Sequence, residues 1–370
     1  MSHSARDNWL SSLNWQMDFC QDSRERTRTD SEFEWKWLEQ SKKQGLVATA
    51  RSILAKVVKP PASGDTSLVT QEWVNKNVVS LWESRNLLAD DLSKLLFDSV
   101  LVLRCSSYGQ YYFPRIDFEN FVTIESEVPF QSDDLPTDYL GLPLRVFKLK
   151  LEHAHEIPSL TILSTRVQID LFNSYRQYCV QRNSIDVTPA AGDVVLDCGA
   201  CIGEISSLFA GLVGVRGQVH LFDPVPLHAR YCELQASMNP AIAKILKINI
   251  LAVGENTHQA EGVQKDATSI SPANVSADSF PTTSLDDYVS ANNLDQVDFI
   301  KMDIEGAEMA AIAGAQNTIR NLKPRLAISS YHKPADLWEI PHRIKELNGD
   351  YQLFFGHHSP INWESVHYAV

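Results

Sequence analysis

The chain of 370 residues lacks the features that mark membrane, secreted and nucleic-acid-binding proteins. No apolar run approaches the roughly 20 residues that span a bilayer, and the first residues, MSHSARDNWLSSLNW, contain no apolar signal-peptide segment. The chain carries 33 Lys and Arg against 46 Asp and Glu, and a net charge of −13 gives no basic face for binding phosphates. We therefore expect a cytoplasmic protein with no transmembrane segment and no nucleic-acid partner.

Regular cysteine spacing, low-complexity tracts and internal repeats are also missing. The six cysteines stand at positions 20, 105, 179, 198, 201 and 232, unlike the disulfide framework of a small secreted domain. Free thiols in a reducing compartment are the simplest interpretation. With 44% hydrophobic and 21% charged residues, the composition is typical of a globular protein that is large enough for substantial cores.

From about residue 193 onward, short apolar runs alternate with amphipathic segments, which predicts βαβ units and a parallel sheet. Helices are predicted between the runs at 204–213, 226–238, 307–322 and 335–347. The last two runs are separated by a loop too short for a helical crossover, so they should pair antiparallel. This layout predicts a seven-stranded Rossmann-like α/β sheet of the class I methyltransferase type, with helices on both faces. The predicted strands are DVVLDCG, QVHLFD, ILKINILAV, VDFIKMD, RLAISSYH, YQLFFGHH and SVHYAV.

The first part of the chain has a different pattern. Residues 1–58 look helical, residues 58–67 have the composition of a linker, and residues 70–104 predict one or two amphipathic helices. Residues 105–165 alternate enough for short strands, including LRVFKL and SLTIL. We therefore divide the chain into an N-terminal appended region, 1–165, and an α/β domain, 166–370. The appended region is expected to cover an acceptor pocket or to form a homodimer contact. Its helical part holds four tryptophans, for which core packing is a simpler role than stacking on sugars: Trp9, Trp15, Trp35 and Trp37.

The stretch VVLDCGACIGE contains two overlapping patterns. One is Cys-x-x-Cys, formed by Cys198 and Cys201, and the other is Asp-x-Gly-x-x-x-Gly, formed by Asp197, Gly199 and Gly203. A redox pair needs a lowered thiol pKa at a helix start, and a zinc site needs further ligands. No second cysteine pair or pair of histidines lies nearby in the sequence. We therefore interpret the two cysteines as small, buried residues.

The glycine pattern predicts a ligand site at the end of the first strand. Gly199 lets the backbone approach a ligand, and Gly203 lets the next helix pack closely. Asp223 ends the next strand, where a carboxylate can accept both ribose hydroxyls of an adenosine ligand. An NAD site would need G-x-G-x-x-G to hold a pyrophosphate. The carboxylate of Asp197 repels pyrophosphate and suits the cationic amino-acid end of S-adenosylmethionine, which is therefore favoured over NAD.

Candidate catalytic groups follow the fourth and fifth strands. Asp303, Glu305 and Glu308 lie in KMDIEGAE, and His332 lies in SSYHK. Ligands of open α/β sheets bind at the carboxyl ends of the strands, so these groups should meet. A hydroxyl that attacks a methyl group needs a base or a metal ion to take or acidify its proton.

His332 is the first choice of base, because an imidazole titrates near neutrality. Asp303 would orient it, bind the hydroxyl, or hold a divalent ion such as magnesium together with Glu305 or Glu308. The alternative for Glu308 is a charge in the first turn of a helix that only stabilises the helix. A structural, hydrogen-bonded histidine is the alternative for His332.

Two other pairs of histidines have simpler interpretations. His357 and His358 follow YQLFF and either line the pocket or, more simply, lie in a solvated loop. His153 and His155 alternate in LEHAHE, which is more typical of one face of a strand than of a metal site.

The motifs from DCGACIGE to the C-terminus together resemble the FkbM-type family of S-adenosylmethionine-dependent methyltransferases. The resemblance covers about residues 190–370 and is most specific in DIEGAE followed by a strand ending in YHK. It implies O-methylation of hydroxyls, commonly on sugars of glycans, glycolipids or natural products. The segments that carry it are DCGACIGEISSLFA, HLFDP, TTSLDDY, VDFIKMDIEGAEMAAIAGAQNTI, KPRLAISSYHKPADLWEIP and HYAV.

The resemblance also implies a set of cofactor contacts. Asp223 departs from the more usual Glu, so its reach to the ribose is one methylene shorter, and Asp286 in TSLDD has no role that we can assign from the sequence. The expected cofactor-binding positions are Asp197, Gly199, Ala200, Gly203, Glu204, Asp223, Pro224, Asn249, Ala252, Val253 and Asp303.

These observations predict an S-adenosylmethionine-dependent O-methyltransferase that releases S-adenosylhomocysteine. Its acceptor would be a sugar hydroxyl of a small molecule or of a glycan or glycolipid precursor. Three alternatives remain: a methyltransferase for a non-sugar hydroxyl or an amine, a catalytically inactive cofactor-binding interaction module, and an NAD-dependent oxidoreductase.

Overall fold

The computed structural model describes residues 3–22, 70–105, 120–152, 154, 156–182, 185–258, 280–359 and 363–370. The linker-like residues 58–67, the YGQYYFP segment and the histidines at 153 and 155 lie outside these ranges. The same holds for Trp35 and Trp37, so the predictions made for these parts stay predictions.

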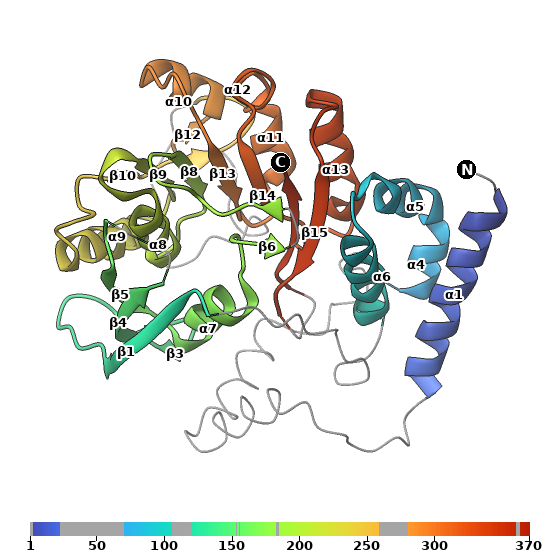
Figure 1. Ribbon diagram of the computed structural model, residues 1–370, viewed down its shortest axis with the longest axis horizontal. Coiled ribbons are helices and arrows are strands. Elements are labelled where there is room, and N and C mark those ends of the chain that lie inside the picture. The colour runs from blue at the N-terminus through green and yellow to red at the C-terminus, as the bar shows by residue number, and fades with distance from the viewer. Residues whose placement is uncertain are drawn as a thin grey trace.

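One seven-stranded sheet crosses the centre of the molecule (Figure 1). Its strand order is β10-β9-β8-β13-β14-β16-β15, and β16 runs antiparallel to both of its neighbours. The other described neighbours in this sheet pair in parallel. This confirms the predicted seven strands with an antiparallel last pair. The strands are β8 (Val194–Cys198), β9 (Gln218–Phe222), β10 (Leu246–Asn249), β13 (Phe299–Met302), β14 (Arg325–Ser329), β15 (Leu353–His357) and β16 (Ser365–Ala369).

The main helices lie where the sequence predicts them. The helices α8 (Glu204–Val213) and α9 (Pro226–Met238) have the predicted bounds, and α13 (Asp336–Leu347) differs by one residue. The prediction of one continuous helix over 307–322 is wrong. The segment forms two helices, α11 (Glu308–Ala313) and α12 (Gln316–Leu322).

The break between α11 and α12 has a packing cause. A Cβ atom on Gly314 would lie 2.1 Å from the carbonyl oxygen of Gly254, so the chain touches another backbone here and turns. Asp286 then caps the new helix, because its carboxylate accepts the backbone N–H groups of Asn317 at 2.9 Å and Thr318 at 2.8 Å. This is the role that the sequence left open for Asp286.

Two helices were not predicted. The helix α10 (Leu285–Ala291) begins inside TTSLDDY, with Ser284 as its N-cap, and α7 (Arg166–Tyr175) precedes the α/β domain's first strand. The helix α10 has only seven residues, so its hydrophobic periodicity covers too few turns to distinguish a helix from a loop.

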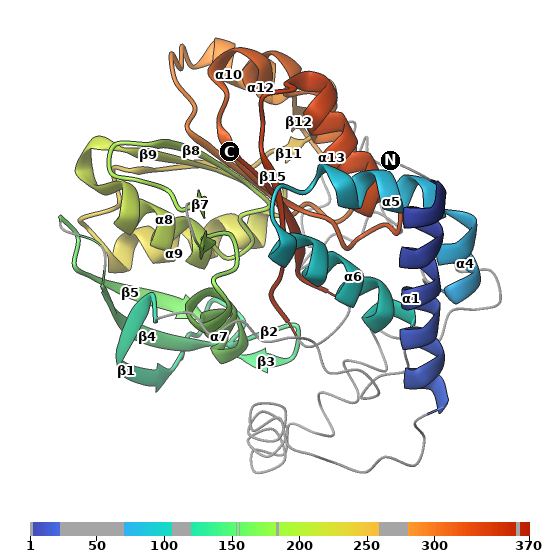
Figure 2. The same ribbon diagram turned by 45° about the vertical axis from the view of Figure 1, so that its right-hand side comes forward.

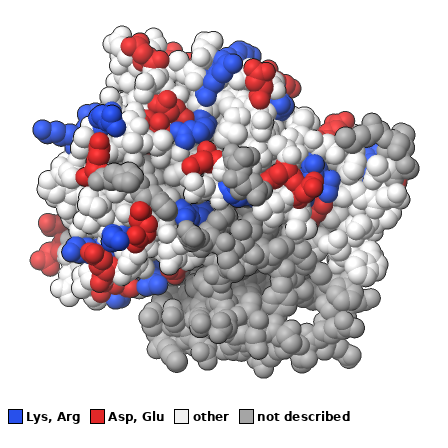
Figure 3. Space-filling view, in the orientation of Figure 1, with Lys and Arg blue, Asp and Glu red and all other residues white. Residues whose placement is uncertain are grey.

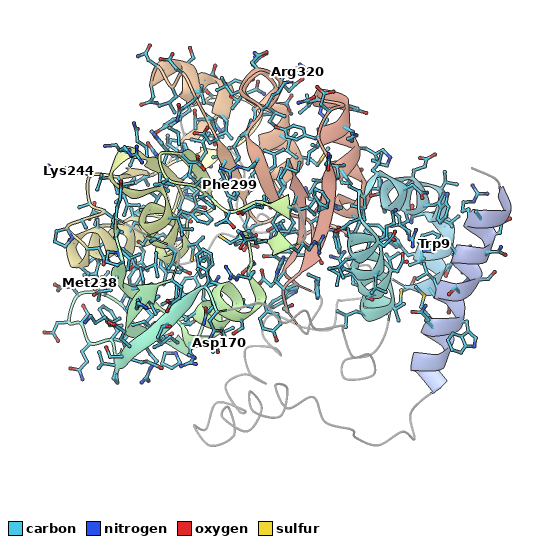
Figure 4. All side chains as sticks on the ribbon, viewed as in Figure 1. Trp9, Asp170, Met238, Lys244, Phe299 and Arg320 are labelled. Atoms are coloured by element: carbon cyan, nitrogen blue, oxygen red, sulfur yellow. The ribbon has the colours of Figure 1, made fainter. Side chains whose placement is uncertain are left out.

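Side chains of the central strands alternate between two cores, as the pleat of a strand requires. Leu196 and Ile300 face the core formed with α11, α12 and α13. Val195 and Phe299 face the core formed with α8 and with a second, antiparallel sheet. Figure 4 shows Phe299 near the middle of the molecule. The second sheet consists of β1 (Val122–Pro129), β4 (Arg145–Leu151) and β5 (Ser159–Ser164) in the order β1-β4-β5.

The N-terminal helices lie beside the outermost strand, β15 (Figures 1 and 2). In α6, the Ser93 hydroxyl accepts the backbone N–H of Phe355 at 2.9 Å, and Phe97 packs edge-on against the Phe355 ring. Trp9 of α1 packs against Trp82 and donates to Asp98 at 2.9 Å, as expected for a tryptophan in a helical core. These contacts cover an edge that would otherwise offer unpaired backbone groups. The helices are α1 (His3–Asp22), α4 (Gln71–Lys76), α5 (Val78–Leu87) and α6 (Asp91–Cys105), so residues 70–104 form three helices where one or two were predicted.

The appended region thus contacts the α/β domain in two separate places. Its helices pack against α13 and β15, whereas the β1-β4-β5 sheet shares a core with α8. The domain boundary at 165/166 and a homodimer contact stay predictions. On the face shown in Figure 3, acidic and basic side chains are interspersed. Within the described ranges, every helix falls short of the length and apolar character needed to cross a bilayer.

Candidate functional site

A buried ion pair lies under the turn that follows β8. Asp197 is fully buried, and its Oδ1 lies 3.1 Å from the Nζ of Lys301 on β13. The hydroxyl of Ser206 donates to the other Asp197 oxygen at 2.5 Å, and the Lys301 ammonium donates to the carbonyl of Gly199 at 2.7 Å. Asp197 therefore holds the turn through two neighbours: Lys301, which binds the carbonyl of Gly199, and Ser206 in α8.

Burial lowers the pKa of Lys301, but the charges of Asp197 and Asp303 outweigh burial and raise it above its ordinary value. The ammonium is therefore charged at neutral pH, and it neutralises Asp197. The sequence analysis missed Lys301. The sequence does contain a signal for Lys301. The run VDFIKM is otherwise apolar after Asp298, so a lysine inside it indicates a buried charge that needs a partner.

Gly199 and Gly203 are required by packing as well as by backbone conformation. Gly199 has φ +85°, and a Cβ atom there would lie 1.8 Å from the carbonyl oxygen of Asp303. Gly203 has φ +82°, and its Cβ would lie 2.9 Å from the Cys232 sulfur. The close approach expected at Gly199 is thus to the backbone that follows β13. The next residue, Ala200, donates its N–H to the carbonyl of Phe222 at 3.0 Å.

The Cys-x-x-Cys residues have the character of packed thiols. Cys198 is fully buried, and burial raises the pKa of its thiol; burial and the nearby acids do the same for Cys201. A thiol with a raised pKa is a poor nucleophile and metal ligand at neutral pH. Every cysteine in the described ranges with a placed side chain is free of disulfides.

Asp223 is fixed at the end of β9 by three donors. Its carboxylate accepts the backbone N–H groups of Cys201 at 3.0 Å and Val225 at 2.9 Å, and it lies 2.9 Å from His228 Nδ1. A carboxylate has about four acceptor positions, so one is left for a ligand. Pro224 directly follows Asp223 and precedes α9. His228, which the sequence analysis missed, fixes the orientation of Asp223.

Glu204 opens α8 and carries a buried oxygen without a donor. Its side chain is 6% exposed, and burial raises the pKa of the carboxyl to about 7. Its Oε2 accepts no hydrogen bond from the described residues. A buried acceptor without a partner costs free energy, so the site fits a ligand that brings a cation or a hydrogen-bond donor.

At the end of the third strand, the side chain of Asn249 bonds to neighbouring parts of the fold. The Asn249 amide donates to the carbonyl of Leu221 at 3.0 Å, and its oxygen accepts the hydroxyl of Tyr288 at 3.1 Å. Ala252 and Val253 form β11 (Ala252–Val253), which pairs with β12 (Thr282–Thr283). The predicted strand ILKINILAV is therefore two strands, and Val253 is buried in the core.

His332 lies between carboxylates at both ring nitrogens. Its Nδ1 lies 2.9 Å from Glu308 Oε1, and its Nε2 lies 3.3 Å from Asp303 Oδ1 and 3.9 Å from Glu305 Oε2. The imidazole is 9% exposed and Glu308 is fully buried, whereas Glu305 is 64% exposed. Burial lowers the pKa of His332, but the Glu308 carboxylate beside Nδ1 and the charges of Asp303 and Glu305 raise it to about 9. His332 is therefore an imidazolium at neutral pH in this arrangement.

Two tyrosines fix the Asp303 carboxylate. The hydroxyl of Tyr178 donates to Asp303 at 2.6 Å, and that of Tyr331 donates at 3.0 Å. The Gln177 amide donates to the Tyr178 oxygen at 3.0 Å and also to Glu364. Gln177, Tyr178 and Glu364 were not predicted as residues of the site. No local signal could have found them, because Tyr178 precedes Asp303 by 125 residues.

Several residues around Asp303 have a positive φ although they are not glycines. Tyr178 has φ 62°, Glu305 has φ 56° and Glu364 has φ 70°. Such conformations cost free energy and persist only where the surrounding structure holds them, often at functional sites. Of the three, Tyr178 bonds to the Asp303 carboxylate directly, and Glu364 is connected to it through Gln177 and Tyr178.

Asp303, Glu308 and His332 are also the only described group whose ligand atoms have metal-like spacing, within 4.8 Å of one another. Glu305, which the sequence placed beside Asp303 as an alternative ligand, is not part of this group. Because each nitrogen of His332 already faces a carboxylate, the positive charge of the imidazolium occupies the centre of the cluster.

The interpretation of His357 and His358 as a solvated loop is wrong. Both are buried, at 7% and 3% exposure. His358 bonds through Nδ1 to the carbonyl of Tyr175 at 2.7 Å and through Nε2 to the hydroxyl of Tyr368 at 2.8 Å. Burial lowers its pKa to about 4, so it is a neutral, structural histidine. The burial of His358 has a tertiary cause, because the residues that bond to it are Tyr175 at the end of α7 and Tyr368 in β16.

Comparisons with known proteins agree with this architecture. Residues 197–353 match the methyltransferase FkbM domain. The chain is similar to the solved methyltransferase FkbM from Methylobacillus flagellatus KT, with 22% identity and a TM-score of 0.52 over 80% of this chain. It covers 60% of that protein, which is less than two thirds of its length, and the likeness shows a shared class I methyltransferase-like fold.

More distant similarities are to two fibrillarins. The one from Aeropyrum pernix was solved with natively bound S-adenosyl-L-methionine, and it has 11% identity and a TM-score of 0.36 over 67% of this chain and 99% of that one. The fibrillarin from Methanococcus jannaschii has 12% identity and the same TM-score of 0.36 over 67% of this chain and 96% of that one. No curated protein sequence matches the chain.

We predict that Asp197→Ala lowers the free energy of unfolding by about 3–5 kcal/mol, because it leaves the Lys301 ammonium buried without a partner. The double variant Asp197→Leu with Lys301→Met should recover most of this loss, since it removes both charges. Urea denaturation followed by circular dichroism measures both. Asp350→Ala, which breaks the exposed pair with Lys323, is the control and should cost under about 1 kcal/mol. A loss under about 1 kcal/mol for Asp197→Ala would contradict its role as the buried partner of Lys301.

Proposed function

We propose that this chain, whose residues 197–353 form a methyltransferase FkbM domain, is an S-adenosylmethionine-dependent O-methyltransferase that acts on a sugar hydroxyl. The observation that carries the proposal is His332, which Glu308 holds at one nitrogen while the other nitrogen faces Asp303. This is the arrangement of an oriented general base next to a fixed carboxylate. It lies at the carboxyl ends of β13 and β14, beside the glycine turn after β8.

The residues of the turn fit the cofactor. The orphaned oxygen of Glu204 suits the cationic end of S-adenosylmethionine, and the remaining acceptor position of Asp223 suits the ribose. We assign the cationic end to Glu204 rather than to Asp197, because Lys301 already neutralises Asp197. When bound, S-adenosylmethionine supplies a methyl group on a sulfonium, which is a good leaving group, and the product is S-adenosylhomocysteine.

His332 would take the proton of the acceptor hydroxyl at Nε2, which makes the oxygen a better nucleophile. Glu308 keeps Nδ1 protonated and stabilises the imidazolium, so Nε2, which lies beside Asp303, is the nitrogen that exchanges the proton. Asp303, held by Tyr178 and Tyr331, positions the hydroxyl. Because the pKa of His332 is raised to about 9, the ring must lose its Nε2 proton before turnover.

The composition of the site supports a polyhydroxylated acceptor. The acids Asp303 and Glu305 and the amide of Gln177 offer hydrogen-bond acceptors, which suit the hydroxyls of a sugar on a glycan, glycolipid precursor or small metabolite. A non-sugar hydroxyl or an amine is the alternative acceptor. An inactive cofactor-binding module is the alternative that requires no acceptor.

A metal-assisted reaction is the second candidate mechanism, and it would use Asp303, Glu308 and His332. We favour the base mechanism, because the imidazolium already places a positive charge between the two carboxylates. We therefore predict that dialysis against a chelator leaves methyl transfer unchanged, measured as release of S-adenosylhomocysteine with a panel of sugar acceptors. Loss of transfer that magnesium or manganese restores would favour the metal.

We predict that the protein binds S-adenosylmethionine and S-adenosylhomocysteine with micromolar affinity and does not bind NAD, as measured by calorimetric titration. Asp223→Ala should weaken binding of S-adenosylhomocysteine at least about tenfold, because it removes a charged hydrogen-bond acceptor. Asp350→Ala, on the exposed surface, is the matched control. Absence of binding by both sulfur nucleotides would favour an interaction module.

We predict that His332 titrates near pH 9, and that Glu308→Gln lowers its pKa toward the ordinary value because the acidic partner of Nδ1 is lost. The histidine C2–H resonance, assigned by its disappearance in His332→Asn, measures this directly. Methyl transfer in the wild type should rise with pH up to about 9, since only the neutral ring accepts a proton. In Glu308→Gln the rise should move to lower pH and the maximal rate should fall.

Glu339→Gln, on the exposed surface, is the control for the removal of one acid. A His332 resonance that titrates at the same pH in Glu308→Gln and in the wild type would refute the assigned pair. Full methyl transfer by His332→Asn would refute its role as the base.

A further inference from the structure

A short hairpin in the appended region carries an unusual turn. The strands β2 (Asp138–Tyr139) and β3 (Leu142–Pro143) are joined by Leu140 and Gly141, with φ 51° and 77°. Positive φ at both positions is what a tight two-residue hairpin requires, and glycine or asparagine normally supplies it. A leucine in this conformation is a steric outlier, which persists only when surrounding contacts hold it.

The chain leading into the hairpin is attached to α9. The hydroxyl of Tyr231 donates to the carbonyl of Pro136 at 2.7 Å, and the guanidinium of Arg230 donates to the carbonyl of Asp134 at 3.0 Å. Leu135 packs into the same apolar cluster as Tyr231. Since α9 follows directly after Asp223, this attachment fixes the hairpin relative to the end of β9.

The residue that the hairpin places at this end is Tyr139. Its ring lies 5.8 Å from the ring of His228, which in turn bonds to Asp223. Burial, with Cys201, Glu204 and Asp223 as close neighbours, raises the pKa of its phenol. Tyr139 therefore lies among the groups that hold the turn after β8 and the end of β9, although it precedes them by more than 60 residues in the chain.

We infer that Tyr139 contacts the cofactor and that its ring forms one wall of the nucleoside subsite beside Asp223 and Glu204. The inference rests on the proposed function, because it requires an adenosine ligand at Asp223. Tyr139 is half-buried and packs against the apolar cluster that contains Tyr231, so the protein holds one part of the side chain while another part stays exposed. An aromatic side chain in this place covers the nucleoside, excludes water and so strengthens the hydrogen bonds of the two carboxylates.

This assigns to the appended region a part of cofactor recognition, since Tyr139 lies outside the matched residues 197–353. The turn at Leu140 and Gly141 is strained because the hairpin must hold Tyr139 against His228. Specificity for the cofactor is then determined by two separate segments of the chain.

Calorimetric titration with S-adenosylhomocysteine tests the inference in the full-length protein. Tyr139→Ala and Tyr139→Leu should raise the Kd roughly 10- to 100-fold, the range found when an aromatic partner of a base is removed. Tyr139→Phe should stay within about threefold of the wild type, because the ring is kept. Leu140→Ala, whose side chain is 55% exposed on the same hairpin, is the matched control and should bind like the wild type.

Thermal unfolding without ligand shows whether each variant is folded, and Tyr139→Leu keeps the apolar contact if Tyr139→Ala does not fold. Unchanged affinity in Tyr139→Leu overturns the inference. Tighter binding in Tyr139→Ala or Tyr139→Leu also overturns it, because the hairpin would then obstruct the site. If Asp223→Ala loses affinity while Tyr139→Leu does not, the proposed cofactor site stands and only the role of Tyr139 fails. If the wild type does not bind, both fail.

Discussion

The buried pair of Lys301 and Asp197 is the interaction on which the rest of the site depends. It connects the adjacent strands β13 and β8 at their carboxyl ends, with a distance of 3.1 Å between the charged atoms. The same ammonium binds the carbonyl of Gly199, and it lies 5.2 Å from the ring of Tyr178. Two charges removed from water are costly unless each finds partners. Here Asp197 has Lys301 and the Ser206 hydroxyl as partners, and Lys301 has Asp197 and the carbonyl of Gly199, so each charge is compensated and the glycine turn is tied to β13.

Asp303 connects this ion pair to the groups around His332. Its carbonyl lies where only a glycine at position 199 leaves room, and its carboxylate receives Tyr178, Tyr331 and His332. The backbone of one residue therefore limits the glycine turn, while its side chain connects the groups around His332. A displacement of this strand end would disturb both parts of the candidate site.

The parts of the chain outside the matched domain complete this arrangement. The helix α6 covers the edge of the sheet at β15, α5 packs against α13, and Arg182 donates to the carbonyl of Phe355 at 3.0 Å. The segment after α7 brings Gln177 and Tyr178 to Asp303, and the β2–β3 hairpin brings Tyr139 to the end of β9. Without these segments, β15 would lack the helix that covers it, and Asp303 would lack Tyr178 as a partner.

Local features of the chain could be predicted from the sequence. The strands from 193 onward, the bounds of α8 and α9, and the need for glycine at 199 and 203 follow from periodicity, capping and turn chemistry, which act between near neighbours. The placement of Asp303, Glu308 and His332 together also followed, because the carboxyl ends of parallel strands share one edge.

Tertiary structure alone decided what each group does. Lys301 neutralises Asp197, Glu308 rather than Asp303 orients His332, and Tyr178 reaches Asp303 from 125 residues away. The break before α12 and the burial of His358 likewise depend on segments far away in the chain. Charge pairing, burial and pKa depend on which atoms meet in three dimensions. Periodicity along the chain records only which face a residue lies on, so the sequence determined the elements and the edge where the site lies, and packing determined its chemistry.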